Sequence, residues 1–332
     1  MFKYFLYKFG QFCLRWLPPP VSLKLGLLMS DLQYYFSFRD RHAVKNNLRV
    51  ITGKETGIPS LTREVFRNFG RYLIEFFTMR KMVNEEYIKK HVKVQGLERI
   101  EEALKLGKGG IVITAHLGNW ELGAVLLSML GYPLVVIALP HKERPVNDLF
   151  NHQRETKGIT IVPTHMAVRR CLETLKGNKL IALVADRDFG LNGEPMDFLG
   201  RKALIPPGPA MFSSATGAPI IPVFLIREED NTFTPLEKTF RDRGSLTGFT
   251  LTVGEPIYPP LKIEKQQEHE VLLFLMRKYV SVIEEKIRLY PAQWLMFRPF
   301  WIKDFTRPAS VLSRLFRLKK KAMKQLNKKE GL

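Results

Sequence analysis

The chain has 332 residues, of which 45% are hydrophobic, and its 52 lysines and arginines exceed its 32 aspartates and glutamates by 20 charges. This length and apolar content predict one large α/β core and exclude a chain that is disordered throughout. The two cysteines, Cys13 and Cys171, form no CxxC pattern, and no two of the seven histidines have the i, i+3 or i, i+4 spacing of a helical metal site. We therefore expect neither a disulfide framework nor a bound metal.

Residues 1–90 are predicted to be helical, and they begin with an amphipathic segment. In "MFKYFLYKFGQFCLRWLPPP" the polar residues Lys3, Lys8, Gln11 and Arg15 fall within a sector of roughly 140° on a helix. Such a helix can lie in a membrane surface, but basic residues interrupt it too often for it to span a membrane or to act as a signal peptide. Alternatively, the same broad apolar face packs on the protein's own core.

From Val92 onward, short apolar runs alternate with helical runs. The predicted strands are 92–95, 110–115, 134–139, 159–162 and 180–184. The predicted helices between them are 97–106, 119–130, 145–157 and 166–176. This βαβα order predicts an α/β fold with a mainly parallel central sheet flanked by helices.

Further elements follow these repeated units. They are a loop at 186–207, a helix near 208–216, strands near 220–226 and 249–253, and a long helix at 264–289. The uncharged run 122–140 is broken by "GYP" and reads as helix, turn and strand, so no transmembrane helix is predicted. We divide the chain into a helical, membrane-associating region (1–90), an α/β domain (91–302) and a basic amphipathic tail (303–332).

The tail concentrates positive charge. From Arg307 to Leu332 it holds nine basic residues and one acid. A segment of this kind attracts anionic surfaces, whether lipid head groups, nucleic acid or an acidic protein, or else it is a solvated end without a partner. A nucleic-acid-binding protein would account for the charge, but it would leave the aromatic N-terminal helix unexplained, so we expect no nucleic-acid partner.

Two ionisable residues, His116 and Glu121, follow the apolar run "GGIVITA". On one continuous helix they would be about 140° apart, so a shared site requires a bend between them. "LGN" supplies a turn with Asn119 as the helix N-cap, and it places both groups at the carboxyl edge of a parallel sheet, where α/β proteins bind ligands. The carboxylate can then orient the imidazole as a general base. Alternatively, the histidine fills the core and the glutamate caps a helix.

No nucleophile accompanies this pair. The sequence has no GxSxG elbow, no P-loop and no cysteine in an activating context. A base without a protein nucleophile suits direct transfer, in which His116 deprotonates a substrate hydroxyl that attacks an activated carbonyl. That reaction is acyl transfer to an alcohol.

Several segments together resemble one family. "AHLGNWEL" is similar to the His-x4-Glu/Asp signature of glycerolipid acyltransferases, in the form typical of the bacterial lipid A biosynthesis (lauroyl/myristoyl) acyltransferase family. Further motifs of that family are matched in order by "RDRHAVKNNLRVI", "RPVNDLFNHQRETKGITIVP", "LVADRDFGLNGEPMDFLGRKALIPPGPAMFSSATGAPIIPVF" and "YPAQWLMFRPFW". The resemblance covers about residues 30–302. "DRD" replaces the family's "DQD" and looks closer to relatives that acylate phosphatidylinositol mannosides, while "FRPFW" replaces "HRRW".

The resemblance implies a glycerolipid acyltransferase-like fold and an enzyme peripheral to the cytoplasmic face of the cell inner membrane. It would move a fatty acyl chain from a thioester of acyl carrier protein or coenzyme A to a hydroxyl of a glycolipid such as a lipid A precursor. The thioester is a co-substrate, and no cofactor is implied. A phosphatidylinositol mannoside-type or lysophospholipid acyltransferase, or a catalytically inactive membrane-associated relative, stays as an alternative.

The resemblance also implies roles for individual residues. His116 would be the general base and Glu121 its orienting partner. The substrate-binding residues would be Asn119, Arg154, Asp186, Arg187, Asp188 and Gly200. Arg154 has the fork geometry to hold a phosphate or carboxylate, unless it is a surface charge, and the glycine would let a ligand approach the backbone. The paired aspartates also fit the metal and nucleotide site of a glycosyltransferase, but no nucleotide-binding loop accompanies them.

Overall fold

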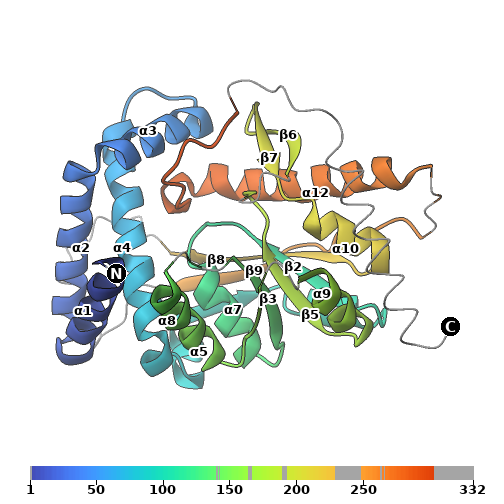
Figure 1. Cartoon of the computed structure of the whole chain (residues 1–332), viewed down its shortest axis with the longest axis horizontal. Helices are drawn as coiled ribbons and strands as arrows, with labels where there is room; N and C mark the ends of the chain where they lie inside the picture. Colours follow the sequence, from blue (N-terminus) through green and yellow to red (C-terminus); the bar gives the residue numbers. More distant parts are fainter. Residues whose placement is uncertain are drawn as a thin grey trace.

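The computed structural model describes residues 2–139, 141, 143–163, 167–188, 193–228, 248–261, 264 and 266–302. Its N-terminal region is helical, as the sequence predicts. The helices are α1 (Phe2–Trp16), α2 (Pro19–Phe36), α3 (Phe38–Thr52), α4 (Ile58–Met82) and α5 (Glu85–His91). The first four gather at one end of the molecule (Figure 1), while the predicted tail lies outside the described residues.

Seven strands form the central sheet, in the order β1, β9, β8, β2, β5, β3, β4. Their bounds are β1 (Val92–Gln95), β9 (Phe249–Val253), β8 (Ile220–Arg227), β2 (Gly110–Thr114), β5 (Leu180–Val184), β3 (Leu134–Ala138) and β4 (Thr160–Pro163). The strands from β8 to β4 are parallel to one another, whereas β9 is antiparallel to β8 and parallel to β1. The prediction of a mainly parallel sheet is confirmed.

Helices cover both faces of this sheet (Figure 1). One layer contains α5, α6 (Glu98–Leu104), α7 (Trp120–Met129) and α8 (Arg144–Glu155); the other contains α9 (Ala167–Lys176), α10 (Gly208–Thr216) and α12 (Glu268–Leu289). Along β2, Ile111 and Ile113 pack in the layer of α12 while Val112 packs in that of α7, because successive strand side chains point to opposite faces. Phe66 of α4 joins the α12 layer, so the N-terminal helices and the sheet share a core.

The segment predicted as a loop at 186–207 contains a hairpin instead. Strands β6 (Glu194–Phe198) and β7 (Arg201–Ile205) pair antiparallel around a two-residue turn. Both turn residues, Leu199 and Gly200, have positive φ (52° and 83°), as a type I′ turn requires, and this explains the glycine. Phe198 and Ile205 are fully buried, so packing on the core stabilises strands whose remaining sequence is polar.

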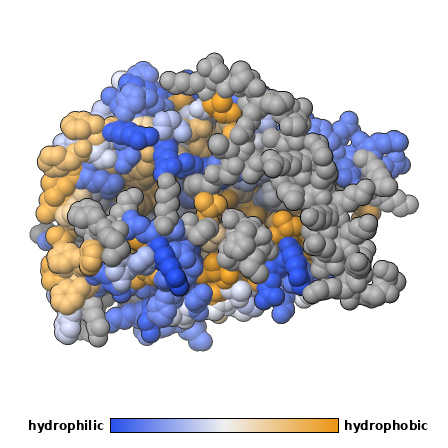
Figure 2. Space-filling model, in the orientation of Figure 1, coloured by the Kyte–Doolittle hydropathy of each residue, from blue (hydrophilic) through white to orange (hydrophobic). Residues whose placement is uncertain are grey.

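Helix α1 uses its two sides differently. Tyr4 and Tyr7 pack on the core, and the Tyr7 ring centroid lies 5.6 Å from that of Phe150 on α8. Four apolar side chains on the other side are at least 61% exposed: Phe5, Phe9, Phe12 and Trp16. The space-filling view shows apolar surface gathered at this end of the molecule (Figure 2). Packing on the core is therefore confirmed for one side of α1, and the exposed side stays available to a membrane. Within the described residues, every helix is too short or too polar to cross a bilayer.

Helix α2 is held tightly against α4. Asp31 of α2 accepts paired hydrogen bonds from the guanidinium groups of Arg63 and Arg67, at 2.7–2.9 Å. At Gly70 of α4 a Cβ atom would lie 2.0 Å from the hydroxyl of Ser30, so only glycine permits this approach. These contacts with α4 determine which side of α2 faces outward.

Candidate active site

Three adjacent parallel strands end at one edge of the sheet. Thr114 ends β2, Val184 ends β5 and Arg227 ends β8. The chain reaches His116 two residues after β2 and Asp186 two residues after β5. The strand order therefore brings together groups that are far apart in the sequence, at the edge where parallel α/β sheets bind ligands.

His116 and Asp186 form a hydrogen-bonded pair. The imidazole Nδ1 lies 2.8 Å from Asp186 Oδ1, and the backbone N–H of His116 donates to Asp186 Oδ2 at 3.1 Å. Asp186 is completely buried, whereas the imidazole is 20% exposed. Although burial opposes ionisation of Asp186, the charge and hydrogen bonds of His116 outweigh it and hold the pKa of this carboxyl below its ordinary value. The carboxylate fixes Nδ1, which leaves Nε2 as the nitrogen for proton transfer.

A C-terminal strap, residues 291–299, fastens this pair. The indole Nε1 of Trp294 donates to Asp186 Oδ2 at 2.9 Å. The N–H of Leu295 donates to the carbonyl of His116 at 2.8 Å, and that of Gly118 donates to the carbonyl of Gln293 at 3.0 Å. The strap thus holds both the aspartate and the backbone on either side of the histidine.

Glu121 lies in the first turn of α7, as predicted, but it does not contact His116. Its carboxylate accepts two hydrogen bonds from Arg154 of α8, from Nε to Oε2 at 2.8 Å and from Nη2 to Oε1 at 2.5 Å. Burial opposes the charge on Arg154, but Glu121 more than compensates and raises the pKa of the guanidinium. Two predicted contacts are thereby corrected: the carboxylate that bonds the imidazole is that of Asp186, and the fork of Arg154 holds the carboxylate of Glu121.

Asn119 shapes the turn between His116 and α7. Its Oδ1 accepts from the N–H of Leu122 at 3.0 Å, which confirms the predicted N-cap. Its Nδ2 donates to Glu75 of α4 at 2.7 Å, and Glu75 in turn forms a two-pronged ion pair with Arg227 at the end of β8. Because Asn119 is fully buried, it supports the turn and is not placed to touch a substrate.

The other predicted substrate-binding residues are distributed around this centre. Arg187 Nη1 lies 3.5 Å from Met296 Sδ on the strap. Burial and the neighbouring charge of Arg298 lower the pKa of Arg187, while the charge of Asp186 opposes the shift. Asp188 accepts from the N–H of Gly193 at 2.7 Å. Gly200 lies in the β6–β7 turn, and substrate contact by it stays a prediction. The described residues contain no cluster of three or more potential metal ligands.

Four residues of this centre carry no role in the prediction: Glu75, Arg227, Gln293 and Trp294. Two of them have a visible signal, because Glu75 interrupts the apolar run "YLIEFF" and Arg227 ends the buried strand "IIPVFLIR". Charged residues in such surroundings are buried only when paired. Gln293 and Trp294 lie in a quoted family motif, and the structure shows that the glutamine amide bonds to both the N–H and the carbonyl of Arg227, at 3.0 and 2.8 Å.

Comparison with known proteins relates the chain to acyltransferases. A phosphatidylinositol mannoside acyltransferase of Mycolicibacterium smegmatis is 25% identical over 86% of this chain and 88% of its own length. A lipid A biosynthesis palmitoleoyltransferase of Escherichia coli is 22% identical over 64% of this chain and 70% of its own. The solved 1-acyl-sn-glycerophosphate acyltransferase of Thermotoga maritima is 15% identical with a TM-score of 0.35, over 80% of this chain and 97% of that one. Residues 1–303 match the family described as bacterial lipid A biosynthesis acyltransferase. The chain is a member of that family, and it is an acyltransferase.

Proposed function

We propose that the protein transfers a fatty acyl group from a thioester to a sugar hydroxyl of a glycolipid at the membrane surface, with His116 as the general base and Asp186 as its orienting partner. The observation that carries this proposal is the Nδ1–Oδ1 contact of 2.8 Å between a buried carboxylate and a partly exposed imidazole. Glu121 has a structural role in this scheme, since Arg154 occupies its carboxylate.

In the proposed reaction, Nδ1–H donates to Asp186 and Nε2 accepts the proton of the acceptor hydroxyl. The hydroxyl oxygen then forms an ester bond with the thioester carbonyl carbon, and the carbon–sulfur bond breaks. The departing sulfur takes the proton from Nε2, which returns the imidazole to its starting form. Asp186 stabilises the imidazolium that exists between the two proton transfers.

The donor is a thioester of acyl carrier protein or coenzyme A, and the acceptor is a glycolipid. Both donors are anionic, which suits a chain with a net charge of +20. Arg187 and Arg298 are the candidates to hold an anionic group of donor or acceptor next to the base. Among acceptors, a phosphatidylinositol mannoside is favoured over a lipid A precursor, because the relative named for it aligns over 86% of the chain against 64% for the palmitoleoyltransferase.

We propose that the enzyme works at the cytoplasmic face of the inner membrane, held there by the outward side of α1. The four exposed aromatic residues of this helix provide an insertion surface of the kind used by interfacial helices, and Lys8 is exposed among them. A membrane-bound site would meet a lipid acceptor without extracting it from the bilayer.

The mechanism is tested by His116→Ala, Asp186→Asn and the double variant, assayed with labelled acyl carrier protein and coenzyme A thioesters on both glycolipids. We expect each single variant to lose on the order of 10²–10⁴-fold in turnover, and the double variant to be barely worse than His116→Ala, because the two residues act as a unit. His152→Ala on α8 is the matched histidine control and should keep its turnover. Thermal melting identifies variants that are merely unfolded. Near-normal turnover by folded His116→Ala would refute the mechanism. A lysophospholipid is assayed alongside the two glycolipids, and turnover of the lysophospholipid alone would refute the glycolipid acceptor.

A further inference from the structure

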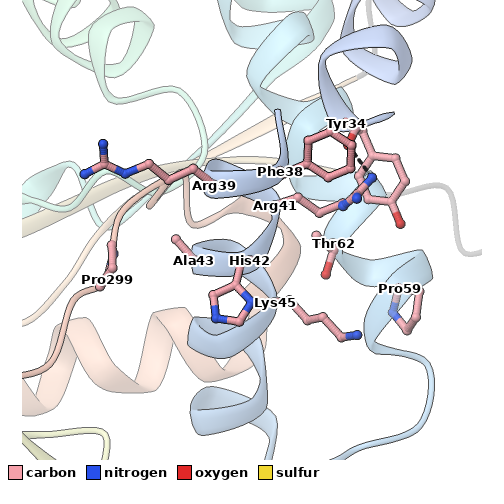
Figure 3. A pocket seen from close by; sticks show the side chains of 10 residues that line it. All are labelled: Tyr34, Phe38, Arg39, Arg41, His42, Ala43, Lys45, Pro59, Thr62 and Pro299. Carbon is pink, nitrogen blue, oxygen red and sulfur yellow. Dashed lines mark hydrogen bonds between the residues drawn. The ribbon is translucent and has the colours of Figure 1, made fainter. Parts of the chain in front are cut away.

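A cavity of about 610 Å³ lies at the start of α3, outside the His–Asp site. Its lining comes from the end of α2, the first turns of α3, the start of α4 and the strap's far end. The residues are Tyr34, Phe38, Arg39, Arg41, His42, Ala43, Lys45, Pro59, Thr62 and Pro299. Figure 3 shows Arg39 extending on one side past Pro299, and Arg41 and Lys45 on the other side. The cavity is therefore flanked by cations from a single short stretch of helix.

These cations lack acidic partners in the part of the chain that the structure describes. No ion pair there includes Arg39, Arg41 or Lys45. Asp40, the one acid between residues 37 and 48, accepts from the hydroxyl of Ser37 at 2.8 Å. Arg41 is held in position by hydrogen bonds to the last carbonyls of α2 and by its place 4.8 Å from the Phe38 ring centroid. Three cations and one carboxylate leave this stretch with a net positive charge around the cavity, as in a site for an anion.

An exposed apolar stripe along α2 leads to the cavity. Along α2, side chains at i, i+4, i+7, i+11 and i+14 are 38–55% exposed: Val21, Leu25, Leu28, Leu32 and Tyr35. Beyond them Phe36 is 75% exposed, and Phe38, which lines the cavity, is 69% exposed. An apolar surface that leads into a cationic cavity matches the order of acyl chain and charged head group in a phospholipid.

We propose that this cavity binds the phosphate-containing head group of an anionic membrane phospholipid, with Arg39 as its charged contact on one side and Lys45, beside Arg41, on the other. This lipid is not the one that is acylated, so the site is additional to the catalytic one. An acidic protein such as an acyl carrier protein would also complement the positive charge. It would leave the exposed stripe of α2 and the exposed aromatic residues Phe36 and Phe38 without a purpose. The proposal rests on the proposed membrane association of α1, and it adds the exposed stripe of α2 to the membrane-facing surface.

Binding here would also orient the catalytic site. Asn47 of α3 donates from Nδ2 to the carbonyls of Met296 and Arg298, at 3.0 and 2.9 Å. The same strap holds Asp186 through Trp294. A head group bound to α3 therefore sets the angle at which the His–Asp pair faces the membrane.

The test is flotation of the full chain with vesicles of phosphatidylcholine, alone or with about one-third phosphatidylglycerol, at low salt. Arg39→Gln/Lys45→Gln should bind the anionic vesicles on the order of 10-fold more weakly, with binding to neutral vesicles unchanged. Lys89→Gln/Lys90→Gln on α5 removes equal charge from a distant exposed position and should cost less than about twofold. Equal loss in the two variants, or no loss in the first, would overturn the proposal.

Two further arms separate the sources of failure. Phe5→Ser/Phe9→Ser should lower binding to both kinds of vesicle; if it lowers neither, the membrane proposal fails on its own account. In Phe38→Trp, dihexanoyl phosphatidic acid below its micelle concentration should change the fluorescence saturably, whereas inorganic phosphate and dihexanoylglycerol should not. A response to inorganic phosphate equal to that of the lipid would overturn the lipid assignment. Loss of acyl carrier protein binding, with vesicle binding intact, in Arg39→Gln/Lys45→Gln would assign the cavity to the donor.

Discussion

Replacing Glu75 with glutamine should strongly destabilise the protein. Glu75 is 4% exposed and Arg227 is 5% exposed, and the carboxylate accepts from both terminal nitrogens of the guanidinium and from Asn119. The glutamine keeps the volume but removes the buried negative charge that faces the Arg227 guanidinium. Breaking a buried pair in this way costs about 3–5 kcal/mol, a large fraction of the 5–15 kcal/mol that holds a typical protein folded.

The assay is urea unfolding at neutral pH, with Glu255→Gln as the control. Glu255 pairs with Arg99 on the surface, where its side chain is 79% exposed, so the control should lose less than about 1 kcal/mol. Glu75→Leu/Arg227→Met removes both charges and should recover much of the lost stability. If Glu75→Gln lowers the free energy of unfolding by no more than the control does, the Glu75–Arg227 pair does not hold together α4, β8 and the turn that contains Asn119. That result would refute the structural role proposed for the pair.

Arg154→Met should cost about 3–5 kcal/mol in urea unfolding because it leaves the Glu121 carboxylate buried and alone, and adding Glu121→Leu should restore most of that loss. Asp31→Asn should cost about 1 kcal/mol at pH 7. The hydrogen bonds of Arg63 and Arg67 hold the pKa of Asp31 below its ordinary value of 3.8. The stability difference between Asp31→Asn and the parent is therefore complete above pH 3.8 and should shrink as the pH falls below 3.8. Urea unfolding at pH 6 and at pH 3 would detect this change. Gly70→Ala should lower the melting temperature through its clash with the hydroxyl of Ser30, and adding Ser30→Ala should relieve part of that cost; an unchanged melting temperature in the single variant would contradict the packing.

The sequence predicts well what depends on neighbouring residues. The alternation of apolar strands and helices, the N-cap at Asn119 and the place of His116 at a sheet edge follow from local patterns, and the structure confirms each. The hairpin near Gly200 is missed because its strands contain Glu, Pro, Asp and Lys, which local propensity assigns to a loop. Burial of its apolar residues, a tertiary effect, decides its structure.

The partner of the histidine could not be predicted in the same way. Spacing places Glu121 near His116 and at the correct end of α7, but it cannot show that the carboxylate faces α8. Asp186 is 70 residues away along the chain, and it reaches the imidazole only because β5 pairs directly with β2. Strand order, which sequence periodicity does not determine, therefore selects the carboxylate that bonds the imidazole of His116.

Helix α4 links α2 to the turn that carries His116 and Asn119. On one side its Arg63 binds Asp31 of α2, whose outward side carries the exposed apolar stripe. Further along, Glu75 reaches the interior, where it binds Arg227 and Asn119 two residues before Glu121. Both attachments are ion pairs with defined geometry, so α4 joins α2 to the turn that carries His116. In the proposed function, where the acceptor is a membrane lipid and His116 is the base, this connection sets the height and angle of His116 relative to the bilayer, and it gives a use to a buried charge on a helix whose other inward residues are mainly apolar.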